Sequence, residues 1–271
     1  MSITPADREA IIALCKAHDG THDMWKRDFR RCIVYKSYFI KYDNDDYLRF
    51  QYETQKYIHS MAIGDPSAPR VPEVVDYFTP DQCTAYLVME FIDNTTPADN
   101  APEKVADALR WLASVPAPAG LTIGSVGGGP ARHRLFKDYR APLLFSSKLA
   151  LETYMNKALE WIPSYGRPAK ISFSDDKVIF TQSDMDKSNF FLDGNGKICI
   201  IDFDTVALLP ESFASYTMRS GTNLFASEVA EYLDWPRSPN QYSMARAGVI
   251  INMTSDWTLG LDKDGLPDTR G

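Results

Sequence analysis

Two stretches near the start of the chain carry hydrophobic residues at helical spacing. Residues 4 to 18 predict a helix that Thr4 can cap and in which Pro5 suits the first helical position. Residues 46 to 61 predict a second helix, in which six side chains fall on one stripe: Tyr47, Phe50, Thr54, Tyr57, Ile58 and Met61.

Strand-like stretches surround the second helix. Residues 32 to 42, 74 to 78 and 84 to 92 are rich in Ile, Val, Tyr and Phe, which favour strands. The first of them is expected to bend or turn at Lys36-Ser37. The polar, Pro-containing stretch from 93 to 102 has the composition of a linker.

The pattern becomes mainly helical after this linker. Residues 102 to 115 and 147 to 162 predict helices, and the chain beyond Pro210 is also mainly helical. Residues 189 to 203 differ, because the turn "DGNG" separates two apolar stretches and predicts a hairpin. This order predicts an α+β protein with two lobes and a cleft.

The linker places the boundary between the lobes. Residues 1 to 92 are expected to form a small, β-rich N-terminal lobe that binds nucleotide. Residues 93 to 271 are expected to form a mostly helical C-terminal lobe for catalysis and substrate binding. A chain of 271 residues with 44% hydrophobic residues is long enough for two lobes around a shared cleft.

Charge narrows the classes of partner. A net charge of −7 argues against binding nucleic acid or an anionic membrane, and it mildly favours an amine-bearing small-molecule ligand. The start of the chain does not resemble a signal peptide, and no apolar run approaches about 18 residues, so a cytoplasmic location is expected. The four cysteines are far apart, which favours reduced thiols over disulfides. The oligomeric state is left open.

Candidate chemistry gathers around the predicted hairpin. Asp184 and Asn189 precede it in "FTQSDMDKSN", and Asp202 follows it in "IIDFD". Because the two strands run out and back, Asp202 is expected to return to the end where Asp184 and Asn189 lie. Asp and Asn oxygens suit Mg²⁺, and a second carboxylate can accept a hydroxyl proton. Phosphoryl transfer needs these two groups, a bound metal and a positioned base.

The motif "SDMDKSN…IIDFD" resembles the catalytic and metal loops of the protein-kinase-like fold. It is most similar to the aminoglycoside phosphotransferase family, in particular to its fungal branch. The resemblance implies that Asp184 is the catalytic base and that Asn189 and Asp202 are metal ligands. Gln182 stands at the position of the family's His.

The resemblance continues upstream, over roughly residues 30 to 220. It implies that Lys41, at the end of an apolar strand, contacts the nucleotide phosphates, and that Glu53 on the following helix is its ion-pair partner. "YLVMEFI" resembles the strand that leads to the adenine-binding hinge, with Glu90 to Ile92 supplying backbone groups. ATP and Mg²⁺ are the implied cofactors.

Three features depart from the family pattern. Gln182 replaces a His whose role is mainly structural hydrogen bonding, Asp204 replaces a Gly that is frequent in protein kinases, and Gly20 is the only glycine among residues 20 to 40. A glycine-rich loop over the phosphates is therefore missing. The chain also lacks a recognisable activation segment, which argues against a protein substrate.

The function expected is transfer of the γ-phosphate of ATP to a hydroxyl of a small molecule. Two alternatives stay open: a non-catalytic binding module on the same fold, and a nucleotidyl-transferring enzyme of the kinase fold. Asp186 has no role in the family pattern, and either a ligand contact or a solvated loop acid fits it. "GGGP" (127 to 130) lacks the context of a phosphate loop and is expected to form a flexible loop on the substrate side.

Overall fold

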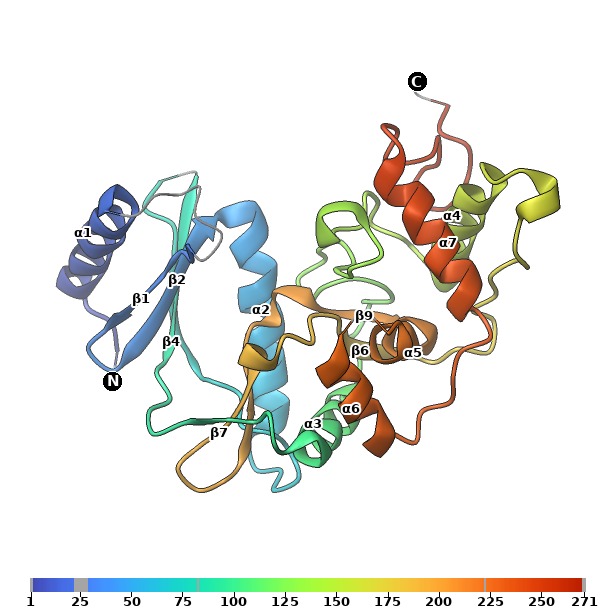
Figure 1. Cartoon of the computed structure of the whole chain (residues 1–271). Coiled ribbons are helices and arrows are strands. Elements are labelled where there is room, and N and C mark those ends of the chain that lie inside the picture. The colour runs from blue at the N-terminus through green and yellow to red at the C-terminus, as the bar shows by residue number, and fades with distance from the viewer. Residues whose placement is uncertain (1, 22–28, 82, 222, 270–271) are drawn as a thin grey trace.

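The N-terminal half is a four-stranded antiparallel sheet with one helix on each face. The computed structural model describes residues 2–21, 29–81, 83–221 and 223–269. Its first sheet has the order β1-β2-β4-β3, and Figure 1 shows α1 on the outer side and α2 on the side of the C-terminal half. The bounds are α1 Pro5–Thr21, β1 Cys32–Tyr35, β2 Tyr38–Asn44, α2 Asp45–Ala62, β3 Val74–Phe78 and β4 Thr84–Glu90.

Alternation along the strands decides which side chains face the cleft. Ile40 and Tyr42 of β2 pack with α1, in a cluster that includes Ile11. Phe39 packs on the opposite face of the sheet, against a second cluster that includes Leu48 of α2. Since successive side chains of a strand point to opposite faces, Lys41 shares the α2 side with Phe39. The expected turn at Lys36-Ser37 is confirmed: Lys36 has a φ of 55° between β1 and β2.

Helix α2 forms as predicted, and its buried face overlaps the predicted stripe only in part. Thr54 and Ile58 of the stripe are buried, whereas Tyr47 is 48% exposed and Met61 38% exposed. The other buried residues of the helix are Leu48, Gln51 and Gln55. Two glutamines therefore take core positions that a hydrophobic pattern assigns to apolar residues.

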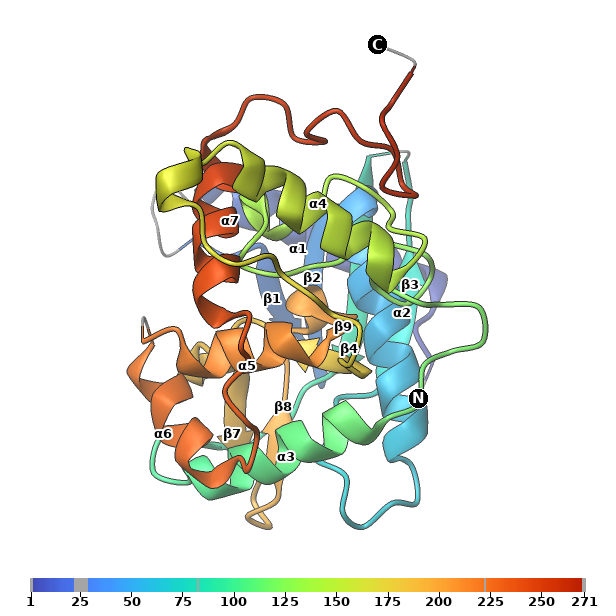
Figure 2. The same ribbon diagram turned by 90° about the vertical axis from the view of Figure 1, so that its right-hand side faces the viewer.

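The C-terminal half contains two small sheets and five helices among its described residues. A three-stranded sheet has the order β5-β7-β8, and β6 pairs with β9. The helices lie around these strands, mostly on the side turned toward the viewer in Figure 2. The bounds are β5 Thr96–Pro97, α3 Pro102–Ser114, α4 Lys148–Glu160, β6 Val178–Gln182, β7 Phe190–Leu192, β8 Ile198–Ile200, β9 Val206–Pro210, α5 Glu211–Arg219, α6 Leu224–Tyr232 and α7 Gln241–Met253. In the described part of the chain, no helix is both long and apolar enough to cross a membrane.

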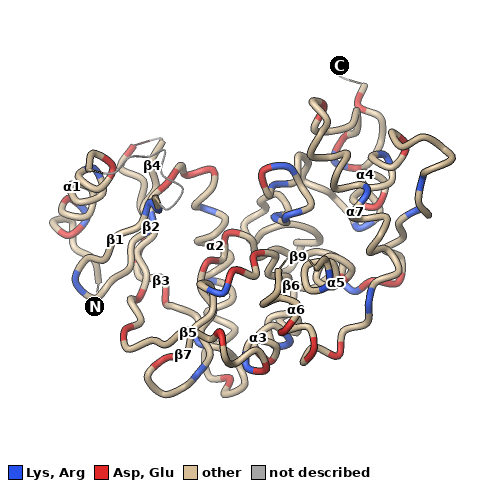
Figure 3. The backbone as a smooth tube through the Cα atoms, in the orientation of Figure 1, with Lys and Arg blue, Asp and Glu red and all other residues tan. Residues whose placement is uncertain are grey.

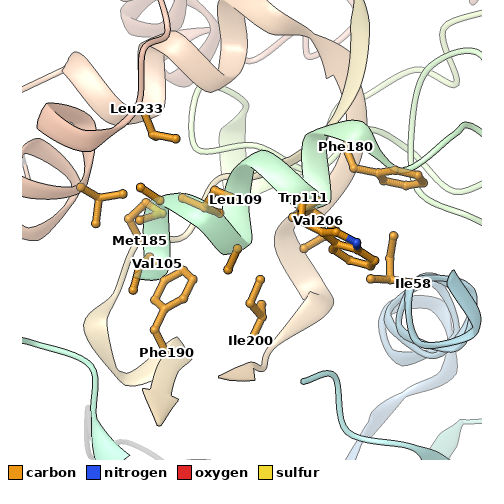
Figure 4. Close-up of a cluster of buried hydrophobic side chains, with 14 of the residues drawn as sticks. Ile58, Val105, Leu109, Trp111, Phe180, Met185, Phe190, Ile200, Val206 and Leu233 are labelled. Atoms are coloured by element: carbon orange, nitrogen blue, oxygen red, sulfur yellow. The ribbon is translucent and has the colours of Figure 1, made fainter. Parts of the chain in front are cut away.

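A hydrophobic cluster anchors the loops around the hairpin. Figure 4 shows Val105 and Leu109 of α3 facing Phe190 and Ile200 of the hairpin. Ile58 of α2 joins the same cluster, so α2 packs into the C-terminal core as well as onto the first sheet. The predicted boundary after residue 92 separates the four-stranded sheet from the other two, but the packing of α2 crosses it.

Candidate active site

One cavity of about 580 Å³ lies between the first sheet and the hairpin β7-β8. Its lining includes five of the residues singled out in the sequence: Lys41, Glu90, Ile92, Asn189 and Asp202. Asp184 and Glu53 are not part of the lining. Residues separated by more than 150 positions in the sequence thus meet around one space.

Apolar side chains line the cavity next to the end of β4. They are Phe39, Met89, Phe91 and Phe191. The amide of Phe91 donates to the carbonyl of Ser37 (3.1 Å). In the described part of the chain, the backbone amide of Ile92 has no hydrogen-bond partner. A backbone donor beside apolar walls can fix the orientation of a bound base.

The side chain of Glu90 serves a different purpose from its backbone. Its carboxylate forms an ion pair with Arg70, which also contacts Asp193 of the hairpin turn at 3.1 Å. Arg70 therefore connects the end of β4 to the hairpin. The carboxylate of Glu90 is therefore occupied, and its amide donates to the carbonyl of Glu73 at 2.9 Å. A backbone contact from Glu90 to a ligand stays a prediction.

Gln182 connects the two loops that carry the candidate catalytic groups. Its Nε2 donates to the carbonyl oxygen of Asp202 at 3.1 Å, and its Oε1 accepts the amide of Asp184 at 3.1 Å. The hydroxyl of Thr205 donates to the same Oε1 and accepts from the amide of Asp184. Gln182 is 2% exposed, so these bonds are shielded from water. The expected hydrogen-bonding role of Gln182 is confirmed.

The 3₁₀ turn η3 (Lys187–Asn189) fixes Asn189 between the two loops. The side-chain Nδ2 of Asn189 donates to the backbone carbonyl of Asp184 at 3.3 Å, and the backbone carbonyl of Asn189 accepts the amide of Ile201. This leaves the side-chain oxygen of Asn189 as the group available to a ligand. The hairpin register Phe190↔Ile200 places Asn189 and Ile201 next to each other, as the out-and-back path of the chain requires.

Asp186 is a structural cap. Its Oδ1 accepts the amide of Ser188 at 2.9 Å and the hydroxyl of Ser188 at 2.7 Å. These hydrogen bonds are the main reason that the pKa of Asp186 lies below its ordinary value. Of the two roles left open by the sequence, the structure supports a loop acid that shapes η3.

Asp202 holds an unusual backbone conformation next to the cavity. Its φ and ψ are 60° and 77°, in the left-handed region that non-glycine residues rarely adopt. Its carboxylate lies 2.8 Å from Nζ of Lys41. Backbone strain of this kind persists only where the surroundings fix it, and it is typical of functional sites.

Glu53 is not beside Lys41. A β-carbon added at Gly127 would lie 3.0 Å from Cγ of Glu53, so this side chain faces the 127–130 loop. The expected ion pair between Lys41 and Glu53 is absent from the part of the chain that the structure describes, where Lys41 pairs with Asp202. The cause is helical geometry: Gln51 faces the cavity, and a residue two positions later points about 200° away.

Gln51 was not recognised from the sequence. It lines the cavity and is 5% exposed, and its Nε2 has no hydrogen-bond partner among the described residues. A buried donor without a partner is costly unless a ligand or water satisfies it. Nothing in the local pattern marks this glutamine, because it lies off the apolar stripe.

Arg132 is a second residue that the sequence did not reveal. Its guanidinium donates to both carboxylate oxygens of Asp204, at 2.7 and 2.6 Å, and lies 5.8 Å from the ring centre of Tyr47. Asp204 and Tyr47 both line the cavity. Arg132 thus joins the segment after Asp202 to the start of α2, which gives Asp204 a structural partner.

The 127–130 loop packs against α2. A β-carbon at Gly129 would lie 2.5 Å from the ring of Phe50, so only glycine allows this contact. The residues just before this loop are hydrogen-bonded to β9, since the amide of Gly124 donates to the carbonyl of Leu208 (3.0 Å). Neither Gly127 nor Gly129 lines the cavity, in line with the expectation that this loop is not a phosphate loop.

The donor set at the inner end of the cavity suits a magnesium ion. Asp202 and Asn189 both line it, and Mg²⁺ needs only one or two protein ligands when phosphate oxygens complete its shell. No group of three or more His, Cys, Asp or Glu side chains arranged for a metal occurs in the described ranges. A site for zinc or another tightly held metal is therefore not indicated there.

The chain resembles known proteins in its structure and not in its sequence. No protein-family model and no curated protein sequence matches the chain. Aminoglycoside 2'-phosphotransferase-IIIa in its GDP complex matches with a TM-score of 0.50 and 11% identity, over 90% of this chain and 87% of that one. The chain has the fold of the aminoglycoside phosphotransferases.

Two further structures complete the comparison. The GDP and kanamycin complex of APH(2")-IIIa aligns with a TM-score of 0.50 and 10% identity, over 90% of this chain and 88% of that one. APH(3'')-Id from Streptomyces rimosus, with ADP and streptomycin, has a TM-score of 0.47 and 15% identity, over 92% and 99% of the two chains. The predicted two-lobed kinase-like fold is confirmed, and the assignment to a fungal branch stays a prediction.

Proposed function

We propose that this protein is a phosphotransferase that moves the γ-phosphate of ATP to a hydroxyl of a small molecule with the help of Mg²⁺. One observation carries the proposal: Lys41, Asn189 and Asp202 line a single cavity whose lining beside Ile92 is apolar. The aminoglycoside phosphotransferase structures of the same fold that hold GDP, in one case with kanamycin, support a nucleotide in this cavity and a small-molecule acceptor beside it.

Each residue has a separate part in the proposed reaction. The backbone of Glu90 and Ile92 holds the base of the nucleotide, and Lys41 contacts its phosphates. Asn189 and Asp202 hold Mg²⁺, which when bound neutralises charge on the phosphate oxygens. Nζ of Lys41 lies 2.8 Å from the carboxylate of Asp202, so the cation proposed for the phosphates and the carboxylate proposed for the metal stand side by side.

Asp184 orients the acceptor hydroxyl and accepts its proton. The carbonyl and amide of Asp184 are held by Asn189 and by Gln182 and Thr205, and its Oδ1 accepts the amide of Asp186 at 3.0 Å. The contact of Asp184 with Asn189 supports a base beside the proposed metal ligand, although Asp184 does not line the cavity itself. A fixed base beside a fixed phosphate supplies the alignment on which phosphoryl transfer depends.

The decisive experiment compares two neighbouring acids. Asp184→Ala is expected to lower kcat about 10³-fold while leaving nucleotide affinity unchanged, because general-base catalysis contributes roughly 10²–10⁴-fold. Asp186→Asn, which keeps the oxygen that caps η3, is the matched control and retains activity. Turnover is measured with a coupled ADP assay over amino alcohols, amino sugars and related hydroxyl compounds, with ATP and GTP as donors.

The alternatives predict different results. A non-catalytic module shows no stabilisation by any nucleotide with Mg²⁺ in a thermal-unfolding series, or binding without turnover. A nucleotidyl transferase adds a nucleotide rather than a phosphate, which the mass of the product reveals. Acidic and basic residues are interspersed over both halves of the chain (Figure 3). The amine-bearing acceptor suggested by the net charge therefore stays a prediction for the same screen.

A further inference from the structure

Two buried glutamines on one face of α2 differ in what satisfies their side chains. Gln55 is 1% exposed, and its Nε2 donates to the carbonyl of Pro72 at 3.0 Å. Gln51, one turn earlier, is 5% exposed, and its Nε2 has no hydrogen-bond partner among the described residues. Of these two glutamines, Gln51 lines the cavity and Gln55 does not. The unpaired amide therefore belongs to the cavity.

The register of the first sheet sets Gln51 beside Lys41. Lys41 of β2 pairs directly with Leu87 of β4, so both side chains lie on the face of the sheet that α2 covers. Leu87 packs in one cluster with Leu48 of α2. Gln51 follows Leu48 by three residues on the same face of the helix, and it lines the same cavity as Lys41. Amide and ammonium group therefore approach the cavity from neighbouring elements.

The missing partner of Gln51 has a defined chemistry. Nε2 of a glutamine carries two N–H donors, so the partner must be an acceptor. A half-turn about the last side-chain bond exchanges Nε2 and Oε1 without displacing the rest of the residue, which lets the donor face a ligand in the cavity. Beside the cation of Lys41 an anionic acceptor is favoured over a neutral one, and hydrogen bonds to ionised acceptors are the stronger kind.

We infer that the side-chain amide of Gln51 donates to a phosphate oxygen of the nucleotide, beside Lys41. The inference rests on the proposed function and adds an uncharged donor to the phosphate contacts proposed there. An unpaired buried amide is unfavourable for the protein alone and becomes favourable when a ligand satisfies it. Removing it is therefore expected to weaken nucleotide binding without weakening the fold, whereas removing the satisfied amide of Gln55 has the reverse effect.

The test compares Gln51→Met with the matched variant Gln55→Met, because methionine is unbranched like glutamine and carries no donor. Gln51→Met is expected to weaken ATP binding with Mg²⁺ about tenfold or more, as for a lost hydrogen bond to a charged group, and to leave Tm unchanged or higher. Gln55→Met lowers Tm by about 2–4 °C, since the carbonyl of Pro72 loses its partner, and changes ATP affinity less than about twofold. Calorimetry measures the affinities, and thermal unfolding without nucleotide measures Tm.

Adenosine locates the contact on the ligand. It has the base and the ribose but no phosphate, so its affinity is expected to be the same in Gln51→Met and in the wild type. The affinity is measured by displacement of a fluorescent ATP derivative. Equal losses for ATP and adenosine in Gln51→Met overturn a contact to phosphate.

The outcomes separate this inference from the proposed function. Wild-type protein that binds no nucleotide overturns both. A Gln51→Met variant that binds ATP as the wild type does overturns the role of Gln51 alone, because a water molecule then satisfies its amide. A Tm that falls in Gln51→Met as far as in Gln55→Met assigns Gln51 to the fold and also overturns the inference. Gln51→Leu repeats the comparison if Gln51→Met does not fold.

Discussion

The two walls of the cavity are built in different ways. On the wall formed by the C-terminal half, Gln182, Thr205 and Asn189 form a closed set of hydrogen bonds around the backbone of Asp184 and Asp202. On the wall formed by the first sheet, Arg31 pairs with Asp43, and their side chains are 42% and 47% exposed. The hydrogen bonds of the first wall are shielded from water, whereas this ion pair of the other wall is open to it.

This difference indicates how the work is divided. The shielded network fixes the proposed base and the proposed metal ligands relative to one another, which is the alignment that the proposed reaction requires. The cations opposite are held by contacts that are weak in water, because exposed ion pairs contribute little and are screened by salt. Nucleotide binding is therefore expected to depend on ionic strength, while the geometry of the catalytic loop is not.

The largest expected effect comes from Asp202→Ala. This variant removes a proposed metal ligand and the ion-pair partner of Lys41, so Mg²⁺-dependent nucleotide binding is lost and kcat/KM falls on the order of 10³-fold. Asp43→Ala removes a carboxylate from the opposite wall and changes kcat/KM by less than about fivefold. Calorimetry with and without Mg²⁺ measures the difference. Equal losses in the two variants would show that the walls are not functionally distinct.

Gln182→Ala tests the closed network. Removing this side chain takes the partner from the carbonyl of Asp202 and from the hydroxyl of Thr205, while the amide of Asp184 keeps its bond to Thr205. The loss costs about 1–3 kcal/mol of the free energy of unfolding. Chemical denaturation measures this loss, and kcat is expected to fall with it because Asp184 and Asp202 lose their common support. Gln182→His, whose ring offers one donor and one acceptor, is expected to lose less stability and less activity than Gln182→Ala. An Ala variant as stable as the wild type would contradict the network.

His133 makes the C-terminal wall sensitive to acid. Burial, reinforced by the charge of Arg134, lowers its pKa to about 3, while Nε2 lies 2.9 Å from the hydroxyl of Thr217. The unfolded chain takes up a proton below about pH 6.5 and the folded chain does not, so stability is present above that pH and is lost as the pH falls toward about 3. The loss is roughly 2 kcal/mol at pH 5.

The measurement for His133 is the free energy of unfolding between pH 7 and pH 5. His133→Asn lowers the free energy of unfolding at every pH, but this free energy changes less between pH 7 and pH 5 than in the wild type. The change with pH, and not the absolute value, tests the role of His133. A variant with the same slope as the wild type would assign the acid sensitivity to other groups. His18, whose pairing with Tyr42 lies in the N-terminal half, provides the comparison variant His18→Gln.

The smallest effect is expected for Glu53→Gln. Because Glu53 faces Gly127 and not Lys41, neutralising it changes nucleotide affinity by less than about twofold, within the range of ordinary surface substitutions. Lys41→Gln is the positive control and weakens binding by a larger factor. If the two variants lose the same affinity, α2 must rotate when nucleotide binds and bring Glu53 to Lys41.

The parts of the site that the sequence predicts are those in which short-range rules act. The "DGNG" turn closes a hairpin, and its register brings Ile201 to Asn189 and so places Asp202 beside the catalytic loop. The order of elements also predicts the two-lobed plan. These results need only strand alternation and turn chemistry.

The remaining parts depend on packing between distant segments. The face that α2 presents to the cavity is set by contacts with both halves, and it buries Gln51 and Gln55, whose side chains no hydrophobic pattern selects. The pairing of Arg132 with Asp204 joins residues that are far apart in the chain. Neither arrangement has a local signal, so the expected pair of Lys41 and Glu53 could not be tested before the fold was known.

The packing of α2 also limits how the molecule can move. Leu48 is held in the core of the first sheet, and Ile58 is held in the core beneath the hairpin. The hydroxyl of Tyr57 is bonded to Pro116, and that of Thr54 to the amide of Val126. The contacts of α2 with both halves hold the first sheet and the C-terminal half together, so a hinge motion that opened the cavity would have to break them. Exchange of the proposed nucleotide is therefore expected to depend on the local motion of side chains at the rim of the cavity rather than on a change in its width.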